Sequence, residues 1–184
     1  MGTWQKLDSS YAHENPYYKI RRDHVIRPDG KHGEFYVLED NRAVFIVAVT
    51  DDGKLLLIKQ FRYTTQMESW EIPAGGIDQD ETPLDAAKRE LREETGYMAD
   101  SWDFLGSLQM SNGKTDAMGD VFICRGLERH ADNKQTEEGI TRAQAFTFNE
   151  IQAMITNHQL TDSNSIAPIM LALATGKLKE WQTL

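Results

Sequence analysis

Three glutamates stand close together in the segment Arg89-Glu90-Leu91-Arg92-Glu93-Glu94. In an α-helix, where successive residues turn by roughly 100°, Glu90, Glu93 and Glu94 fall on one side. Like charges three and four residues apart repel each other, and anions near the C-terminal end of a helix oppose its dipole by roughly 0.3–1 kcal/mol each. Folding alone does not favour this arrangement, whereas a cation of high charge density compensates for it. We therefore predict a divalent metal site here.

The helix that must carry these glutamates has recognisable ends. Thr82 is a suitable N-cap, Pro83 suits the first turn, and Gly96 suits the position just after the helix. We therefore predict a helix from Pro83 to about Thr95. The acidic side of this helix borders an apolar stripe made by Leu84, Ala87 and Leu91.

The segment from Gly75 to Tyr97 resembles the signature of the Nudix hydrolase family. The matching positions are Gly75, Glu81, Arg89-Glu90, Leu91, Glu93-Glu94 and Gly96, followed by a hydrophobic residue. Tyr97 stands where the family usually has an aliphatic residue, and its ring can pack in the same place. The alternative is an ordinary solvated helix rich in charge, which does not account for a match at so many fixed offsets.

The resemblance implies a role for each acidic residue. Glu90 and Glu94 are the principal metal ligands, the backbone carbonyl of Ala74 is a third, and Glu93 contributes directly or through water. Arg89 has a supporting role and can orient Glu93, which lies one helical turn further on. Taken alone, Arg89 could equally belong to a solvated ion pair. Mg²⁺ is the expected ion, with Mn²⁺ as the alternative, because Mg²⁺ prefers oxygen ligands and bridges carboxylates to substrate phosphates.

Residues before the signature resemble the branch of the family that hydrolyses ADP-ribose and related nucleoside diphosphate sugars. They are Gln60-Phe61-Arg62-Tyr63 and the run from Trp70 to Gly76. By resemblance Arg62 contacts the diphosphate, and its planar guanidinium suits phosphate oxygens. We expect Glu71 to accept hydrogen bonds from a sugar. Tyr17 and Tyr18 are candidates to stack on the base, and because only one of two adjacent residues on a strand can face a ligand, Tyr17 is the one chosen. Ordinary ion pairs remain the alternative for the charged residues, and packing for Tyr17.

A general base is expected on a loop after the signature, because this branch often supplies it from there. In the segment from Gln135 to Ile140 the candidates are Glu138 and, second, Glu137. The alternative is a solvated acidic loop. Members specific for ADP-ribose often carry a proline soon after the signature, whereas this chain has Ser111-Asn112-Gly113.

We therefore predict a Mg²⁺-dependent hydrolase of nucleoside diphosphate sugars, ADP-ribose among them, that yields a nucleoside monophosphate and a sugar phosphate. Two other functions remain open. One is a Nudix hydrolase of nucleoside triphosphates or dinucleoside polyphosphates. The other is a non-catalytic sensor of nucleotide sugars, although such proteins usually lose signature carboxylates that this chain keeps.

Composition predicts one domain spanning residues 1–184, because a chain of 184 residues with 40% hydrophobic residues can bury one sizeable core. Residues 1–42 should form a strand region. The resemblance to the branch that hydrolyses nucleoside diphosphate sugars implies a homodimer, and this region could contribute to its interface through Trp4, Tyr11 and Tyr17. The formal net charge of −9 provides no broad basic surface for nucleic acid or an anionic membrane.

A cytoplasmic location is expected. Cys124 is the only cysteine, so no internal disulfide can form, and a buried structural thiol is the favoured interpretation. The N-terminal residues lack the apolar core of a signal peptide, and the apolar run from Ala43 to Val49 is too short to span a bilayer.

The order of strands and helices predicts an α+β layered fold. The resemblance to the Nudix family implies its form, a Nudix-type α/β/α sandwich with a mixed central sheet and an N-terminal antiparallel strand region. Besides the signature helix, helices are predicted at residues 149–157 and 161–175. An Asp-Asp-Gly turn at residues 51–53 predicts a hairpin between its flanking strands. Strands are predicted at residues 17–22, 23–27, 34–39, 43–50, 55–61, 70–73, 102–110, 121–127 and 143–148.

Overall fold

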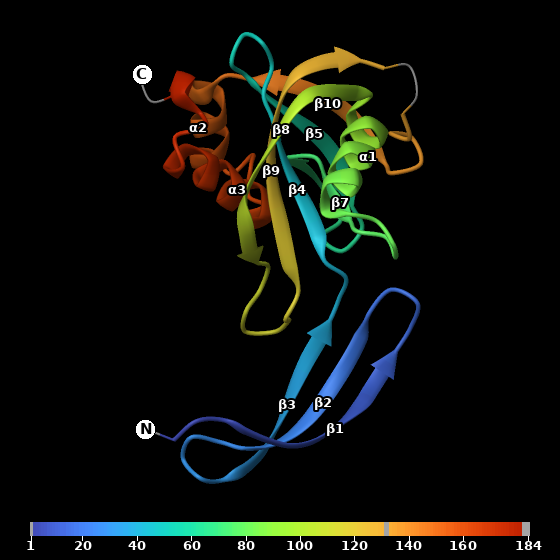
Figure 1. Cartoon of the computed structure of the whole chain (residues 1–184), viewed down its shortest axis with the longest axis vertical. Coiled ribbons are helices and arrows are strands. Elements are labelled where there is room, and N and C mark those ends of the chain that lie inside the picture. The colour runs from blue at the N-terminus through green and yellow to red at the C-terminus, as the bar shows by residue number, and fades with distance from the viewer. Residues whose placement is uncertain (1, 131–132, 182–184) are drawn as a thin grey trace. The chain divides into compact units, whose positions relative to one another are not determined.

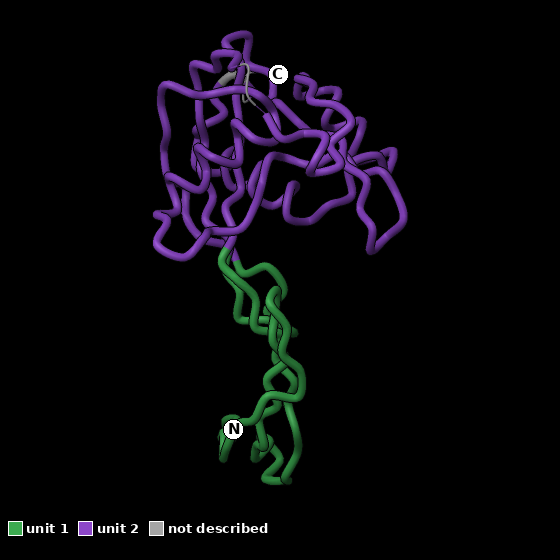
Figure 2. The backbone as a smooth tube through the Cα atoms, turned by 90° about the vertical axis from the view of Figure 1, so that its right-hand side faces the viewer, with its two compact units in different colours: residues 1–42, 109–118 green, residues 43–108, 119–184 purple. Residues whose placement is uncertain are grey.

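The computed structural model describes residues 2–130 and 133–181. The chain divides into two compact units (Figure 2). One comprises Met1–Arg42 and Gln109–Met118, and the other comprises Ala43–Leu108 and Gly119–Leu184. The single domain of residues 1–184 expected from the sequence stays a prediction.

The first unit is built on a three-stranded antiparallel sheet in the order β1-β2-β3. Its strands are β1 (Gln5–Glu14), β2 (Lys19–Ile26) and β3 (His32–Glu39). The antiparallel N-terminal region is therefore present, although its strands differ from the prediction. Residues 17–27, predicted as two strands, contain the single strand β2, and the turn before it includes Tyr17.

Strand β1 was not predicted, because its polar and apolar residues do not alternate. Every residue of β1 is exposed, so no buried face imposes a pattern on it. Pairing with β2 defines the strand instead, from Gln5 opposite Ile26 to Glu14 opposite Lys19. A strand that is stabilised mainly by pairing with its neighbour has little recognisable hydrophobic pattern in its own sequence.

The second unit contains a four-stranded sheet in the order β7-β4-β9-β8. The strands are β4 (Ala43–Ala48), β7 (Ala74–Gly76), β8 (Tyr97–Gln109) and β9 (Met118–Arg129). Strand β4 runs parallel to β9 and antiparallel to β7. The mixed central sheet predicted from the sequence is therefore confirmed.

A second sheet in this unit is antiparallel, in the order β10-β5-β6. It consists of β5 (Leu55–Arg62), β6 (Met67–Glu71) and β10 (Ile140–Phe146). The predicted turn at residues 51–53 is present, but the strands that flank it belong to different sheets and meet only at the bridge between Val49 and Leu55. The two strands therefore do not form the extended hairpin that the turn suggested.

Three α-helices accompany the sheets: α1 (Pro83–Thr95), α2 (Phe148–Thr156) and α3 (Ser163–Ala174). A short 3-10 helix covers Lys179–Trp181. Helices α1 and α3 both contact β4, and Figure 1 shows α1 on one side of the central sheet with α2 and α3 on the other. This arrangement confirms the α/β/α sandwich. No helix among the described residues is long and apolar enough to cross a membrane.

Helix α1 has the ends predicted for it. The Thr82 side chain accepts a hydrogen bond from the backbone N–H of Asp85, and Gly96 closes the helix with a φ of 73°. The apolar stripe of α1, including Leu91, packs in a buried cluster with Val44 and Phe122 of the central sheet. Because this packing fixes the rotation of the helix, it also fixes where the three glutamates point.

Candidate active site

The three signature glutamates are buried on one side of α1, since Glu90, Glu93 and Glu94 are only 7%, 7% and 4% exposed. Burial raises the pKa of Glu94 well above its usual range, against the lowering effect of a hydrogen bond from the Ala74 backbone. Burial also raises the pKa of Glu90, although the neighbouring Arg89 opposes this shift. Such a concentration of buried negative charge is costly unless cations compensate for it.

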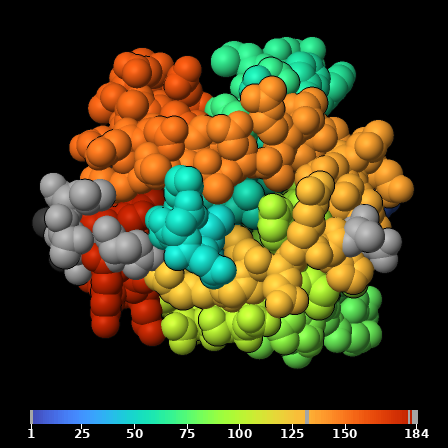
Figure 3. Space-filling model, turned by 90° about the horizontal axis from the view of Figure 1, so that it is seen from above, coloured from blue at the N-terminus to red at the C-terminus, as the bar shows by residue number. Residues whose placement is uncertain are grey.

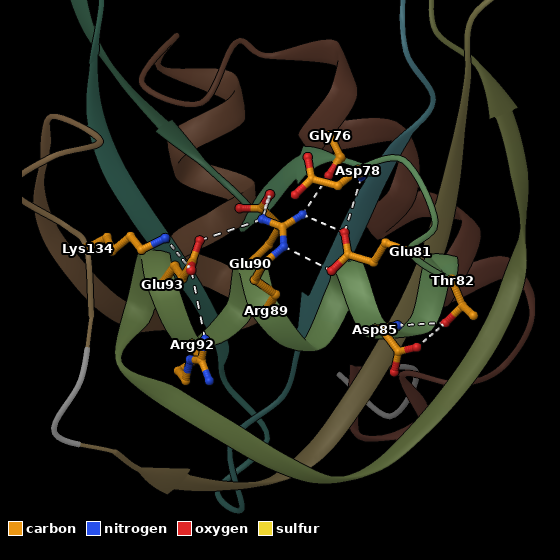
Figure 4. A network of polar contacts seen from close by, with 10 residues as sticks. All are labelled: Gly76, Asp78, Glu81, Thr82, Asp85, Arg89, Glu90, Arg92, Glu93 and Lys134. Carbon is orange, nitrogen blue, oxygen red and sulfur yellow. Dashed lines mark hydrogen bonds and ion pairs between the residues drawn. The ribbon is translucent and has the colours of Figure 1, made fainter.

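Arg89 is the central cation of this network (Figure 4). Its guanidinium donates to both carboxylate oxygens of Glu81, from Nε at 3.0 Å and from Nη2 at 2.9 Å. It also donates to Glu90 Oε1 at 2.6 Å and to the carbonyl oxygen of Gly76 at 2.8 Å. The pKa of Arg89 is raised, chiefly by the hydrogen bonds to Glu81, so the side chain remains a cation.

The edge strand β7 lies directly against the glutamates. The backbone N–H of Ala74 donates to Glu94 Oε2 at 2.8 Å. A Cβ atom added to Gly75 would lie 2.1 Å from Glu90 Oε1, so only glycine leaves room for this carboxylate. The glycine that begins the signature is therefore explained by close approach of the backbone to Glu90.

Glu93 is paired with a lysine that the sequence did not single out. Lys134 Nζ lies 2.6 Å from Glu93 Oε1, and this hydrogen bond raises the pKa of the lysine. Arg89, the residue expected to orient Glu93, is a more distant partner at 3.6 Å. Glu93 is therefore held mainly by Lys134, while Arg89 is engaged chiefly with Glu81 and Glu90.

The loop of residues 134–139, which carries Glu137 and Glu138, is attached to the C-terminal end of α1. The backbone N–H of Lys134 donates to the carbonyl of Glu93 at 2.8 Å, and Gln135 Nε2 donates to the carbonyl of Glu94 at 2.9 Å. In Figure 3 atoms in the yellow-green of the C-terminal part of α1 lie next to atoms in the yellow-orange of the later part of the chain. The loop is thus fastened beside the glutamates.

Of the two candidate bases, Glu138 is the one whose charge acts on Glu90 and Glu94, the expected metal ligands. Its carboxylate contributes to the raised pKa of both Glu90 and Glu94, whereas Glu137 acts on Lys134. The Glu138 side chain is exposed. The backbone carbonyl of Glu138 accepts a hydrogen bond from Gln60 Nε2 at 2.7 Å.

Arg62 and Glu71, both expected to bind substrate, are bound to each other. Arg62 Nε lies 3.0 Å from Glu71 Oε1 and 3.1 Å from Glu71 Oε2, and Nη2 also donates to Glu71 Oε2. The hydrogen bonds to Glu71 are the main cause of the raised pKa of Arg62, and the charges of Glu94 and Asp162 raise it further. The guanidinium therefore interacts electrostatically with Glu94. The ion pair that was the alternative for both residues is therefore present, and their contact with substrate stays a prediction.

Tyr17 belongs to the first unit and is 80% exposed. It lies in the turn between β1 and β2, where Asn15 Oδ1 accepts hydrogen bonds from the backbone N–H groups of Tyr17 and Tyr18. The alternation of side chains along a strand therefore does not decide which of the two tyrosines can face a ligand. A role for Tyr17 in base stacking stays a prediction.

The atoms that Glu90, Glu94 and the Ala74 carbonyl could offer to a metal ion are all oxygen atoms. Oxygen ligands suit a hard divalent cation. Among the residues that the structure describes, no group of three or more His, Cys, Asp or Glu side chains is already arranged to hold a metal ion. The carboxylates are instead satisfied by protein donors such as Arg89 and Ala74. Each carboxylate has several acceptor positions, so it can keep such a donor and still bind a cation.

The structure thus places three buried carboxylates on a helix that packs against a mixed sheet, beside the short strand β7. Residues 39–167 match the model of the NUDIX domain, and residues 4–38 match that of the nucleoside diphosphate sugar hydrolase N-terminal domain. The chain belongs to the Nudix hydrolase family. Membership of this family implies a divalent metal ion as cofactor.

Comparison with individual proteins agrees with this assignment. The chain is 31% identical over 177 residues to an ADP-ribose pyrophosphatase of Mycobacterium tuberculosis, covering 94% of this chain and 86% of the relative. It is 32% identical over 150 residues to a GDP-mannose pyrophosphatase of Yersinia enterocolitica, covering 76% of each. The fold is similar to that of a crystal structure of an ADP compounds hydrolase, with a TM-score of 0.83, 18% identity and 98% coverage of each chain.

Proposed function

We propose that this protein hydrolyses the diphosphate linkage of nucleoside diphosphate sugars, ADP-ribose among them, and releases a nucleoside monophosphate and a sugar phosphate. The observation that carries the proposal is the set of buried glutamates on α1, whose charge the fold tolerates beside Arg89. The names of the relatives and of the N-terminal domain model support this substrate class.

The proposal is tested by identifying the products formed from a panel of nucleoside diphosphate sugars. Release of a nucleoside monophosphate together with a sugar phosphate supports it. Release of pyrophosphate from nucleoside triphosphates, with the sugar nucleotides left intact, would favour the other Nudix chemistry. Binding of a nucleotide sugar without turnover would indicate a sensor.

Glu90 and Glu94 are the proposed metal ligands, together with the backbone carbonyl of Ala74, and Mg²⁺ is the proposed ion. A bound divalent cation would supply charge neutralisation for the diphosphate and lower the pKa of a coordinated water. Support comes from the all-oxygen donor set and from the room that Gly75 leaves for the Glu90 carboxylate. Isothermal titration with Mg²⁺ and Mn²⁺ measures this binding directly, and Glu90→Gln should weaken it.

The remaining catalytic roles fall to residues of α1 and of the 134–139 loop. Glu138 is proposed to accept a proton from the attacking water, since its charge acts on both Glu90 and Glu94. Glu93 supports the metal site, and Arg89 holds Glu90 in position. Glu138→Gln should lower kcat, and an unchanged kcat would remove Glu138 from the mechanism.

Arg62, Glu71 and Tyr17 are proposed to bind the substrate. Because Arg62 uses its Nε and Nη2 on Glu71, the ion pair presents the guanidinium in a fixed orientation. Arg62→Lys keeps the charge but cannot reproduce the planar fork, so KM should rise. Tyr17→Leu should raise KM if the ring stacks on the base.

A homodimer and a cytoplasmic location are the last parts of the proposal. The strand β1 is exposed along its whole length, and several large apolar side chains of the first unit are also exposed. They include Trp4, Leu7, Tyr11, Phe35 and Tyr36. Exposed aromatic residues of this kind are typical of protein interfaces. Sedimentation equilibrium should show a dimer, and the free thiol of Cys124 suits a reducing compartment.

A further inference from the structure

Strand β5 carries one buried polar side chain that the proposed mechanism does not use. Gln60 is only 7% exposed, and its neighbour Ile58 on the same strand is fully buried. Its Nε2 donates to the backbone carbonyl of Glu138 at 2.7 Å. Its Oε1 has no hydrogen-bond partner among the described residues. The amide orientation is fixed by this contact, because only the nitrogen can donate to a carbonyl.

Packing does not explain a glutamine at this position. A buried acceptor without a partner is unfavourable, whereas methionine has a similar length and shape and would leave no polar atom unpaired. The feature that distinguishes glutamine from methionine here is the hydrogen bond to Glu138. The role of this side chain therefore lies with the loop that carries Glu138.

The 134–139 loop is fixed at its start by contacts with α1. Lys134 and Gln135 both bond to carbonyl oxygens in the last turn of this helix. Gln60 fixes the other end of the loop, at Glu138 itself, and the backbone N–H of Phe61 makes a longer contact of 3.4 Å with the carbonyl of Gly139. The hydrogen bond from Gln60 is thus the shorter of these two links between β5 and the end of the loop.

We propose that Gln60 is a positioning residue that holds Glu138 beside Glu90 and Glu94 by binding the Glu138 backbone. This inference rests on the proposed role of Glu138 as general base. In this proposal Gln60 acts through the Glu138 backbone and not through a contact of its own with the substrate. When the hydrogen bond is lost, the Glu138 carboxylate spends less time near the two metal ligands, so kcat falls while substrate binding is unchanged.

A double-mutant cycle between Gln60→Met and Glu138→Gln tests this inference. With ADP-ribose and Mg²⁺, Gln60→Met alone should lower kcat by roughly 10- to 100-fold, with KM changed by less than about threefold. In the Glu138→Gln background the same substitution should have no further effect, because there is no longer a base to position. A purely structural role of Gln60 would lower kcat equally in both backgrounds.

Gln144→Met is the matched control, because Gln144 is an exposed glutamine on the adjacent strand β10 and should tolerate the change. Thermal unfolding of each variant verifies that it is folded, and Gln60→Leu replaces Gln60→Met if the latter is not. Equal losses of kcat in the two backgrounds overturn the inference and leave Glu138 as the base. Normal turnover by Glu138→Gln alone overturns the assignment of the base, and this inference with it.

Discussion

Arg89 binds both carboxylate oxygens of Glu81, at 3.0 Å and 2.9 Å, while the same guanidinium donates to Glu90 at 2.6 Å. It thereby joins the segment before α1 to a buried glutamate within the helix. Because a guanidinium offers several donors in a rigid plane, one side chain can orient two carboxylates at once. The geometry of Glu90 therefore depends on Arg89, a residue outside the proposed pair of metal ligands.

Replacing Arg89 with lysine should separate charge from geometry. The ammonium keeps the positive charge but cannot reproduce the two-point contact with Glu81 while also reaching Glu90. We expect Arg89→Lys to lower kcat/KM by at least about tenfold and to reduce the free energy of unfolding by about 1–2 kcal/mol. Steady-state kinetics and urea unfolding measure the two effects. The control is Arg92→Lys on the exposed side of α1, and equal behaviour of the two variants would contradict the assigned role.

Two adjacent glycines should respond differently to substitution by alanine. A Cβ at Gly75 would meet Glu90 Oε1 at 2.1 Å, whereas a Cβ at Gly76 has no atom within 4 Å. Gly75→Ala should therefore displace the Glu90 carboxylate and lower both Mg²⁺ affinity and kcat, while Gly76→Ala should stay close to the wild type in both. Calorimetric titration and product assays measure these quantities. Full activity of Gly75→Ala would show that the position of Glu90 is unimportant.

Glu94→Gln should have opposite effects on activity and stability. Glutamine preserves an oxygen that can accept from the Ala74 N–H but removes the buried charge, so turnover should fall by several powers of ten. Burial raises the folded-state pKa of Glu94 above its ordinary value of 4.5. The contribution of the Glu94 side chain to the free energy of unfolding is therefore full below pH 4.5 and is lost as the pH rises through the raised pKa.

In chelator, the Glu94→Gln variant should accordingly melt at a higher temperature than the wild type near neutral pH. A gain of about 1 kcal/mol corresponds to roughly 2–4 °C for a chain of this size. The difference should shrink as the pH falls toward 4.5. Differential scanning calorimetry over this range provides the measurement. A variant that is less stable than the wild type at neutral pH would show that the Glu94 charge does not destabilise the metal-free protein.

Cys124 should be inert in the folded protein. The side chain is fully buried on β9, and burial raises the pKa of its thiol to about 12. Because the thiolate is the reactive form, a thiol reagent should modify Cys124 in denaturant but not in native buffer near neutral pH. Rapid labelling of the native protein, followed by absorbance or mass spectrometry, would show that the strand opens readily.

The elements that the sequence predicts best are those with local signals. Helix α1 has its N-cap, its first-turn proline and its closing glycine within its own segment, and both of its ends match the prediction. Strand β1 has no such signal, because it is exposed on both faces and is defined by pairing with β2. The turn at residues 51–53 was found, but the assignment of its flanking strands to separate sheets depends on contacts with β9 and β10.

The same distinction applies to the candidate site. The glutamates of α1 are neighbours in the sequence, so their clustering can be read from spacing alone. The contact between Gln60 and Glu138 joins residues 78 positions apart, and nothing local in the sequence predicts it. Gln60 itself carried little signal, because on β5 it follows the apolar run Leu55–Ile58 and another polar residue, Lys59. Lys134 carried no signal either, since it lies in a polar loop.

The most direct test of the account is an analysis of the products of ADP-ribose hydrolysis, first with Mg²⁺ and then with excess chelator. We expect AMP and ribose 5-phosphate in equal amounts with the metal, and no turnover once the metal is removed. Glu94→Gln, which remains folded, should behave like the chelated wild type. Hydrolysis that continues at an undiminished rate in chelator would contradict the central claim that the buried glutamates of α1 act by binding a divalent ion.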